Sequence, residues 1–257
     1  MDLGIQGRVA IVTGGSRGLG RVSALALARE GVSVAICGRT KSTLDGTVDE
    51  LRALGVSAAG IIADMAEESA AQAVYDGAVS ALGPVDILVN NVGGRRGAGF
   101  AETDEATFML GFEVNFFGAM RLMRLAIPGM RDRKWGRIVN ISSIYGREHG
   151  GSADYMASKA ALIACTKFTG VELIKDNVLV NSIAPGSIIH PGGSWERFSN
   201  ERPPEVVEEF IARNLPVGRF GWPEPVGDLV AYLSSERASM ITGTCIPVDA
   251  GQGRSLI

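Results

Sequence analysis

The sequence predicts an α/β fold built around a doubly wound parallel sheet. Short runs of β-branched and other apolar residues alternate along the chain with longer segments of helical apolar spacing. This alternation is typical of βαβ units, whose strands are apolar throughout because helices cover both faces of the sheet. Length and composition agree, since 257 residues with 46% hydrophobic content can form one large core.

The main elements can be named in chain order from these patterns. The expected strands are Val9–Thr13, Val32–Cys37, Ser57–Ala63, Ile87–Asn90, Arg137–Ser142, Val178–Ile183 and Thr244–Val248. The expected helices include Leu19–Glu30, Glu68–Leu82, Asp104–Met130 and Ala153–Lys175.

No repeat, low-complexity tract or linker interrupts this alternation, so residues 1–257 are expected to form a single domain. The Pro/Gly-rich stretch from Pro185 to Pro204 lies between a strand and a helix, and it predicts a substrate lid at about residues 187–214. Trp195 and Phe198 in this stretch either close over an apolar substrate or hold the lid in place.

Composition argues against several classes of partner. The net charge of −3 provides no basic excess for nucleic acid, and no run of about eighteen apolar residues predicts a membrane span. The N-terminus has no basic segment ahead of an apolar one, so a cytoplasmic protein is expected. Cys37, Cys165 and Cys245 are widely spaced among apolar neighbours, which favours reduced thiols and no metal site.

Three glycines, Gly14, Gly18 and Gly20, lie at the turn between the first strand and the first helix, in the pattern T-G-x-x-x-G-x-G. Glycines permit a tight turn and let the backbone approach a phosphate, and a helix N-terminus adds unpaired N–H groups. The turn is therefore expected to bind the pyrophosphate of a dinucleotide. The other residues of this turn expected to line the site are Ser16, Arg17 and Leu19.

Further motifs follow in order: Asn90-Asn91-Val92-Gly93, the pair Ser142-Ser143, and Tyr155-Met156-Ala157-Ser158-Lys159. With the glycine turn, they resemble the short-chain dehydrogenase/reductase family over nearly the whole chain, most of all its bacterial 3-oxoacyl-acyl-carrier-protein reductase type. The resemblance implies a single Rossmann-type domain of about seven parallel strands and a homotetramer. It also implies hydride transfer between NAD or NADP and a small-molecule ketone or secondary alcohol.

Tyr155 and Lys159 are four residues apart, so on a helix they project from the same face. A free phenol has a pKa of about 10, and a nearby ammonium favours the phenolate. Tyr155 is therefore expected to act as the general acid in reduction and the general base in oxidation, with Lys159 lowering its pKa. The resemblance adds that Lys159 binds the nicotinamide ribose hydroxyls.

A serine is expected to bond the substrate oxygen and stabilise the charge that develops on it. The pattern Ser-x-x-Gly selects Ser143 with Gly146, whereas counting back from Tyr155 selects Ser142, because the loop between them is one residue shorter than the family commonly has. Ser143 is favoured, since strand ends hold register better than loops do.

The resemblance assigns roles to several polar residues. Asn115 matches an asparagine that bonds a water in a proton relay behind the lysine; the alternative is a polar residue that caps or kinks a helix. Asn91 and Gly93 match the turn beside the cofactor ribose, and Asp64 matches the residue that bonds the adenine amino group.

The end of the second strand bears on the choice of cofactor. Gly38 stands where an NAD-binding site carries a carboxylate, Arg39 follows it, and Arg17 can reach the same place. Two arginines and no acid favour the 2′-phosphate of NADP. The alternative is that Arg39 stacks on the adenine or faces solvent.

Pro185, Gly186 and Ile188 are expected, by resemblance, to contact the nicotinamide end of the cofactor. Where the family usually has a threonine that bonds the carboxamide, this chain has His190. His190 either donates the same bond, faces the substrate or is an ordinary loop residue.

Several charged residues near the expected pocket either recognise a polar or anionic part of the substrate or are solvated. They are Arg95, Arg96, Arg147, Glu148 and His149. Asp154, directly before Tyr155, is expected to cap the N-terminus of its helix.

The leading hypothesis is an NADP(H)-dependent oxidoreductase acting on a ketone or secondary alcohol. One alternative is an NAD-dependent sugar, polyol or steroid alcohol dehydrogenase. Others are a catalytically silent dinucleotide-binding protein, which would not need to keep Ser143, Tyr155, Lys159 and Asn115 together, and an isomerase or dehydratase that retains its cofactor.

Overall fold

Seven apolar segments pair as parallel strands within residues 1–256, the part of the chain that the computed structural model describes. They form one sheet in the order β3-β2-β1-β4-β5-β6-β7. The strands are β1 (Val9–Thr13), β2 (Ser33–Gly38), β3 (Ala58–Ile62), β4 (Ile87–Asn90), β5 (Gly136–Ile141), β6 (Val178–Pro185) and β7 (Cys245–Val248). The predicted doubly wound parallel sheet is confirmed, and each strand lies within two residues of its expected bounds.

The sheet reverses its direction of growth beside β1. Ile11 of β1 pairs with Ala35 of β2 on one side and with Leu88 of β4 on the other. The chain therefore runs outward through β2 and β3 before it returns to β4. Such a reversal leaves a crevice at the carboxyl ends of the two central strands, where open α/β sheets bind their ligands.

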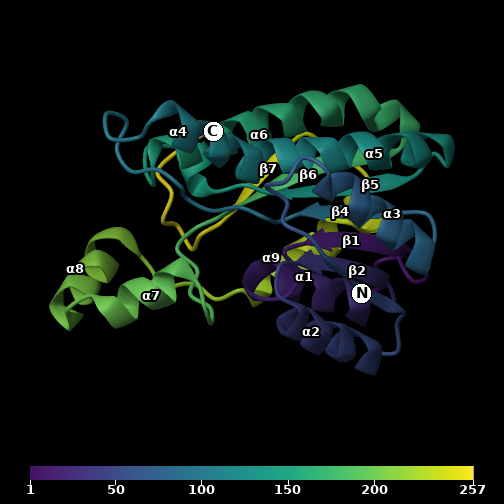
Figure 1. The fold of residues 1–257 in the computed structure, drawn as a ribbon, viewed down its shortest axis with the longest axis horizontal. Coiled ribbons are helices and arrows are strands. Elements are labelled where there is room, and N and C mark those ends of the chain that lie inside the picture. Colours follow the sequence, from purple (N-terminus) through teal and green to yellow (C-terminus); the bar gives the residue numbers. More distant parts are fainter. Residues whose placement is uncertain (257) are drawn as a thin grey trace.

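Helices cover both faces of the sheet (Figure 1), with α1, α2 and α9 on one face and α3, α5 and α6 on the other. The helices are α1 (Gly18–Arg29), α2 (Lys41–Ala53), α3 (Ala70–Leu82), α4 (Glu105–Phe112), α5 (Gly118–Asp132), α6 (Ala153–Leu173), α7 (Ser194–Glu201), α8 (Pro204–Asn214) and α9 (Glu224–Leu233). Helices α7 and α8 project from the body of the molecule on the side of α4 and the C-terminus.

Alternation along each strand divides the core between the two faces. In β1, Ala10 and Val12 join the cluster under α1, α2 and α9, whereas Ile11 joins the cluster under α3 and α5. Successive strand residues point to opposite faces, so a strand buried on both sides must be apolar at every position. This requirement explains the unbroken apolar runs in the sequence.

The segment expected as a helix over Asp104–Met130 is helical without a gap from Glu105 to Asp132, but the helix is not regular throughout. The chain forms α4, then a π-helical turn over Glu113–Phe117, and then α5. The side-chain amide of Asn115 donates to the carbonyl of Gly111 at 2.8 Å. It therefore occupies the acceptor four residues back that an α-helical backbone N–H would use, and a side chain inserted in this way interrupts the regular ladder.

Other features of residues 1–256 bear on function class. No helix in this part of the chain is both long enough and apolar enough to cross a membrane. Cys37, Cys165 and Cys245 are unpaired, and no group of three or more His, Cys, Asp or Glu side chains within these residues could hold a metal ion.

A fully buried arginine lies at the amino end of β5, opposite the crevice. The Arg137 guanidinium stacks 4.4 Å from the Trp135 ring centroid, and its Nη2 lies 3.4 Å from a Glu236 carboxylate oxygen. It also donates to the carbonyls of Gly136 and Asn177 at 2.9 and 3.1 Å. Burial lowers the pKa of Arg137 to about 10, while the Glu236 charge opposes that shift.

Replacing Arg137 with alanine should strongly destabilise the fold, because the change opens a cavity and removes one donor each from Glu236 and from the carbonyls of Gly136 and Asn177. We expect a loss of about 3 kcal/mol in the free energy of unfolding, measured in urea. Arg124→Ala on the exposed face of α5 should change it by less than about 0.5 kcal/mol. Equal effects of the two substitutions would contradict this account of the buried arginine.

Candidate active site

Ser143 and Tyr155 meet at the carboxyl end of β5. Ser143 follows β5, Tyr155 lies in the first turn of α6, and the Ser143 hydroxyl is near enough to the phenol to lower its pKa. Burial raises the pKa of the Tyr155 phenol, whereas the Ser143 hydroxyl and the positive charge of Arg95 lower it. Ser142 instead faces the thiol of Cys245 on β7. Only Ser143 of the two serines is therefore placed beside the phenol.

Lys159 is buried one helical turn below Tyr155, with 2% of its surface exposed. Its Nζ donates to the carbonyl of Ile141 at 2.7 Å and lies 5.8 Å from the centroid of the Tyr155 ring. Burial lowers the pKa of Lys159 to about 7. Lys159 was expected from the sequence to lower the pKa of Tyr155. The groups that shift this pKa are Ser143, Tyr145 and Arg95, together with burial, and Lys159 is not one of them.

Asn115 and Gly93 complete the surroundings of the lysine. A Cβ atom on Gly93 would lie 2.8 Å from both Asn115 Oδ1 and Lys159 Nζ, so only glycine lets these two groups approach the backbone here. Asn115 Oδ1 accepts from the N–H of Gly94 at 2.9 Å, and its amide donates to the Gly94 carbonyl at 3.0 Å. The structure thus brings Asn115, Lys159, Tyr155 and Ser143 together.

The glycine turn is tied to the end of β4. Asn91 Nδ2 donates to the Thr13 carbonyl at 2.9 Å, and Thr13 Oγ1 accepts from the backbone N–H groups of Asn91 and Val92 at 2.8 and 3.1 Å. A Cβ on Gly20 would collide with the Gly14 carbonyl and with the Asn91 amide. The turn therefore brings bare backbone to the crevice, as a phosphate site requires.

The end of β2 lies beside the same turn. A Cβ on Gly38 would lie 3.1 Å from Ser16 Oγ, so a carboxylate side chain at this position would crowd the Ser16 hydroxyl. Arg39 is exposed, and its guanidinium lies 3.5 Å from the carboxylate of Asp64. Arg39 was expected to bind the 2′-phosphate and Asp64 the adenine amino group, and the two side chains lie close enough to form an ion pair.

His190 and Arg17 connect the glycine turn to the segment that precedes α7. The imidazole lies over Gly18, where a Cβ would be 2.6 to 2.9 Å from its ring atoms. Arg17 Nη1 donates to the carbonyl of Gly192 at 3.4 Å, so its side chain is directed to this segment and not to the end of β2, where it was expected from the sequence. The His190 ring therefore covers the phosphate turn, and it is hydrogen bonded through Nδ1 to the Pro191 carbonyl at 3.1 Å.

Pro185, Gly186 and Ile188 lie where β6 ends. Gly186 donates to the Val248 carbonyl at 3.1 Å, and Ile188 is buried and forms a bridge with Gly221. These contacts hold the start of the segment 187–193 at the carboxyl edge of the sheet, on the same side as Tyr155 and the glycine turn.

The aromatic residues of α7 form a small core of their own. Trp195 lies 5.6 Å from Phe198, 4.9 Å from Phe210 and 5.4 Å from Phe220, measured between ring centroids. Such packing favours the second of the two sequence interpretations, in which Trp195 and Phe198 hold the projecting helices together.

Asp154 does not cap α6, contrary to the sequence expectation. Its carboxylate is fully buried and accepts from the backbone N–H groups of Arg96 and Gly97, both at 3.1 Å. The loop after β4 passes across the start of α6, and the carboxylate accepts hydrogen bonds from this loop instead of from the N–H groups at the start of the helix.

Sequence reasoning did not assign Tyr145 to the site. A Cβ on Gly151 would lie 3.3 Å from both the Tyr145 and Tyr155 rings, so the two phenols stand on either side of this glycine. Burial raises the pKa of Tyr145, and the charge of Glu148 raises it further. The aromatic residue within Ser-x-x-Gly was the available signal, but nothing local indicated that it would face Tyr155.

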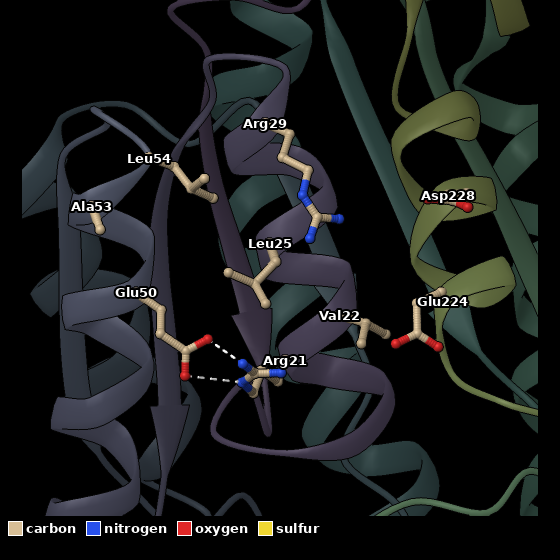
Figure 2. Close-up of a pocket in the computed structure, with 9 residues that line it drawn as sticks. All are labelled: Arg21, Val22, Leu25, Arg29, Glu50, Ala53, Leu54, Glu224 and Asp228. Carbon is tan, nitrogen blue, oxygen red and sulfur yellow. Dashed lines mark hydrogen bonds and ion pairs between the residues drawn. The ribbon is translucent and has the colours of Figure 1, made fainter.

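A separate groove of about 350 Å³ lies between α1, α2 and α9 (Figure 2). An ion pair between Arg21 and Glu50 crosses it, while Glu224 and Asp228 line its opposite wall. The groove holds none of the residues gathered around Tyr155, so it is not the candidate active site.

Comparison with known proteins places this arrangement among characterised enzymes. The family model for short chain dehydrogenases matches residues 8–197. The 3-oxoacyl-acyl-carrier-protein reductase FabG of Aquifex aeolicus is 35% identical over 253 residues, which cover 98% of this chain and 99% of that protein.

Solved structures give the same picture. L-sorbose reductase from Gluconobacter frateurii, complexed with NADPH and L-sorbose, superposes with a TM-score of 0.90 at 31% identity and covers 100% of both chains. A 7α-hydroxysteroid dehydrogenase complexed with NADH and a 7-oxo bile acid superposes with a TM-score of 0.89 at 31% identity, covering 100% of this chain and 98% of that chain.

The buried lysine predicts a specific pH dependence of stability. Between its folded pKa of about 7 and the ordinary value of 10.5, the unfolded chain binds a proton that the folded chain does not. The free energy of unfolding should therefore rise with pH across this window on account of Lys159.

Urea unfolding of the cofactor-free protein at pH 7, 8, 9 and 10 checks this expectation. The free energy of unfolding of the wild type minus that of Lys159→Met should increase by more than about 1 kcal/mol from pH 7 to pH 10, because a pKa shift of one unit corresponds to about 1.4 kcal/mol. The Met variant subtracts the titration of all other groups. A difference that stays constant with pH would show that the ammonium is not desolvated in the fold.

Proposed function

The chain belongs to the short-chain dehydrogenase family, and from this we propose that it transfers hydride between NADP(H) and a ketone or secondary alcohol, with Tyr155 as the general acid and base. An oxidoreductase that acts on CH–OH or C=O groups with NAD(P) follows from the family and from its reductase relatives. The observation that carries the finer proposal is the placement of the Ser143 hydroxyl near the Tyr155 phenol, one helical turn from the buried Lys159.

Ser143 and Tyr155 offer two donors to one substrate oxygen. In the reduction, NADPH, when bound, would supply a hydride to the carbonyl carbon, and the Tyr155 phenol would give its proton to the oxygen, which forms the alcohol. Ser143 would bond the same oxygen and stabilise the charge that develops on it. In the oxidation, the phenolate would take the hydroxyl proton, and NADP⁺ would accept the hydride that leaves the carbon.

Lys159 and Asn115 act behind the phenol. A lysine with a pKa of about 7 changes its charge readily near neutral pH, so it suits the exchange of protons with Tyr155. It also lies where it can bond ribose hydroxyls, since Gly93 leaves the space above Nζ open. Asn115 positions the loop at Gly94 and the lysine, and it would hold a water at the end of the relay.

The crevice fits a dinucleotide. The backbone at Gly14, Gly18 and Gly20 occupies a position that side chains would fill, which suits a pyrophosphate at the start of α1. Ser16, Arg17 and Leu19 would line the phosphates, and Asn91 and Gly93 the ribose. Asp64 would contact the adenine, and Pro185, Gly186 and Ile188 the nicotinamide end. His190 would contact the phosphates, because its ring lies over Gly18.

NADP is the proposed cofactor. Gly38 puts no carboxylate beside the Ser16 hydroxyl to repel a 2′-phosphate, and the exposed Arg39 that follows it would bind that phosphate. The sorbose reductase is complexed with NADPH and the hydroxysteroid dehydrogenase with NADH, so relatives of similar distance use either cofactor. The proposal of NADP therefore depends on Gly38 and Arg39 at the end of β2.

The working form is proposed to be a cytoplasmic homotetramer of single-domain subunits, each with a lid at about residues 187–214. Helices α7 and α8 project near the carboxyl edge of the sheet, where they can close over a substrate (Figure 1). Exposed apolar side chains on α4 and α6, which suit contact with other subunits, are Met109, Leu110, Phe168 and Val171.

The roles of the serines and the tyrosine can be separated by substitution. Tyr155→Phe should lower kcat/KM by about 10²- to 10⁴-fold, and Ser143→Ala by about 10²-fold, because each removes a donor to the developing charge. Ser142→Ala is the matched control and should retain nearly full activity. Nicotinamide absorbance with 3-oxoacyl thioesters, sugars and cyclic ketones measures these rates. An unimpaired Tyr155→Phe enzyme would refute the mechanism.

The cofactor proposal predicts that Arg39→Ala raises the KM for NADPH by about 10-fold or more and leaves the KM for NADH nearly unchanged. The lost charge-assisted hydrogen bond to a phosphate is worth about 1.5–3 kcal/mol. Lys41→Ala, two residues on and paired with Asp45, serves as the control for loss of a surface charge. Faster turnover of the wild type with NADH would favour the NAD-dependent alternative.

A further inference from the structure

The loop after β4 is held in place on both sides of Arg95. Gly94 exchanges two hydrogen bonds with the buried Asn115, at 2.9 and 3.0 Å. Arg96 and Gly97 both donate to the fully buried carboxylate of Asp154 at 3.1 Å. The backbone that carries Arg95 is therefore positioned by one side chain from the π-helical turn and one from α6.

Arg95 lies between these two anchored points of the loop, next to Gly94 at Asn115 and Arg96 at Asp154. Its side chain is exposed, and it forms no ion pair or hydrogen bond with another group in residues 1–256. Its charge lowers the pKa values of both Tyr145 and Tyr155, which flank Gly151. The nearest acid to influence Tyr145, Glu148, already accepts from the backbone N–H groups at 254 and 255.

An exposed arginine is ordinarily solvated and has little effect on stability. Here a buried carboxylate holds the loop, and burial of a carboxylate costs free energy unless hydrogen bonds offset it. Arg96 has the same exposure but is not among the charges that shift the pKa of either phenol. The charge of Arg95 therefore acts on both phenols, and its backbone is held beside Asn115 and Asp154.

We propose that Arg95 binds an anionic oxygen group of the substrate, a carboxylate or a phosphate, and thereby orients a nearby carbonyl toward Tyr155 and Ser143. The substrates would be oxo acids or phosphorylated ketones and their alcohols. A guanidinium fork matches two oxygens of either group, and no carboxylate of residues 1–256 forms an ion pair with Arg95. This inference rests on the proposed function, because it names the substrate class of the same site.

Matched substrate pairs test it by turnover. With NADPH, 3-oxobutanoate is compared with its methyl ester, and dihydroxyacetone phosphate with dihydroxyacetone. The wild type should prefer at least one anion over its neutral partner. Arg95→Ala should lower kcat/KM for that anion by about 10- to 100-fold, the size of a lost charge-assisted hydrogen bond, with little effect on the neutral partner. Arg95→Lys should recover part of the loss, since lysine keeps the charge without the fork.

Arg96→Ala is the matched control and should keep the preference of the wild type. An anion preference that is absent in the wild type, or unchanged in Arg95→Ala, overturns the inference while leaving the proposed hydride transfer intact. The pair that shows the effect distinguishes carboxylate from phosphate as the recognised group.

Binding measured without turnover separates the two proposals. Saturation-transfer NMR follows butanoate and methyl phosphate with the protein and NADP⁺. Binding of one anion by the wild type and by Arg96→Ala, and its loss in Arg95→Ala, would support the anion site even if no carbonyl were reduced. In that case the proposed function would fail and the anion site would stand. Equal binding by the wild type and Arg95→Ala would overturn the inference.

Discussion

The burial of Lys159 constrains the rest of the site. An ammonium withdrawn from water is costly unless it is hydrogen bonded, and the fold offsets the cost with the Ile141 carbonyl at the end of β5. The lysine can reach this position only because position 93 carries no side chain. Its helix then sets where Tyr155 stands, and the end of β5 sets where Ser143 stands. The chemistry therefore depends on one buried charge shared between a strand end and a helix.

The π-helical turn over Glu113–Phe117 determines where the Asn115 side chain lies. In a regular helix through residues 113–117, a backbone N–H would donate to the Gly111 carbonyl, and the Asn115 side chain could not bond that carbonyl. Because the side chain of Asn115 takes that carbonyl, its other amide atoms face the loop at Gly94. The same interruption thus holds Gly93 over the lysine and supports the backbone before Arg95. Local irregularity in helices is frequent at functional sites for this reason.

Asp154 and His190 show how loops acquire functions that their own sequences do not indicate. Asp154 lies beside Tyr155 in sequence but binds a loop that precedes it by nearly sixty residues. His190 covers a glycine turn about 170 residues earlier. Both contacts arise because the carboxyl ends of β1, β4, β5 and β6 share one edge of the sheet. The sheet therefore assembles the pocket from segments that have no local relation.

The sequence by itself determined the strands, the glycine turn and the pairing of Tyr155 with Lys159, because each depends on a short, regular spacing: apolar runs, a strand-to-helix turn, and residues one helical turn apart. The tertiary structure alone decided which serine lies beside Tyr155, where the helix is interrupted at Asn115, and which groups Asp154 contacts. It also decided the positions of Arg95, Tyr145 and His190. These features depend on contacts between loops, whose paths follow from the packing of strand ends and helices and leave no periodic signal in the chain.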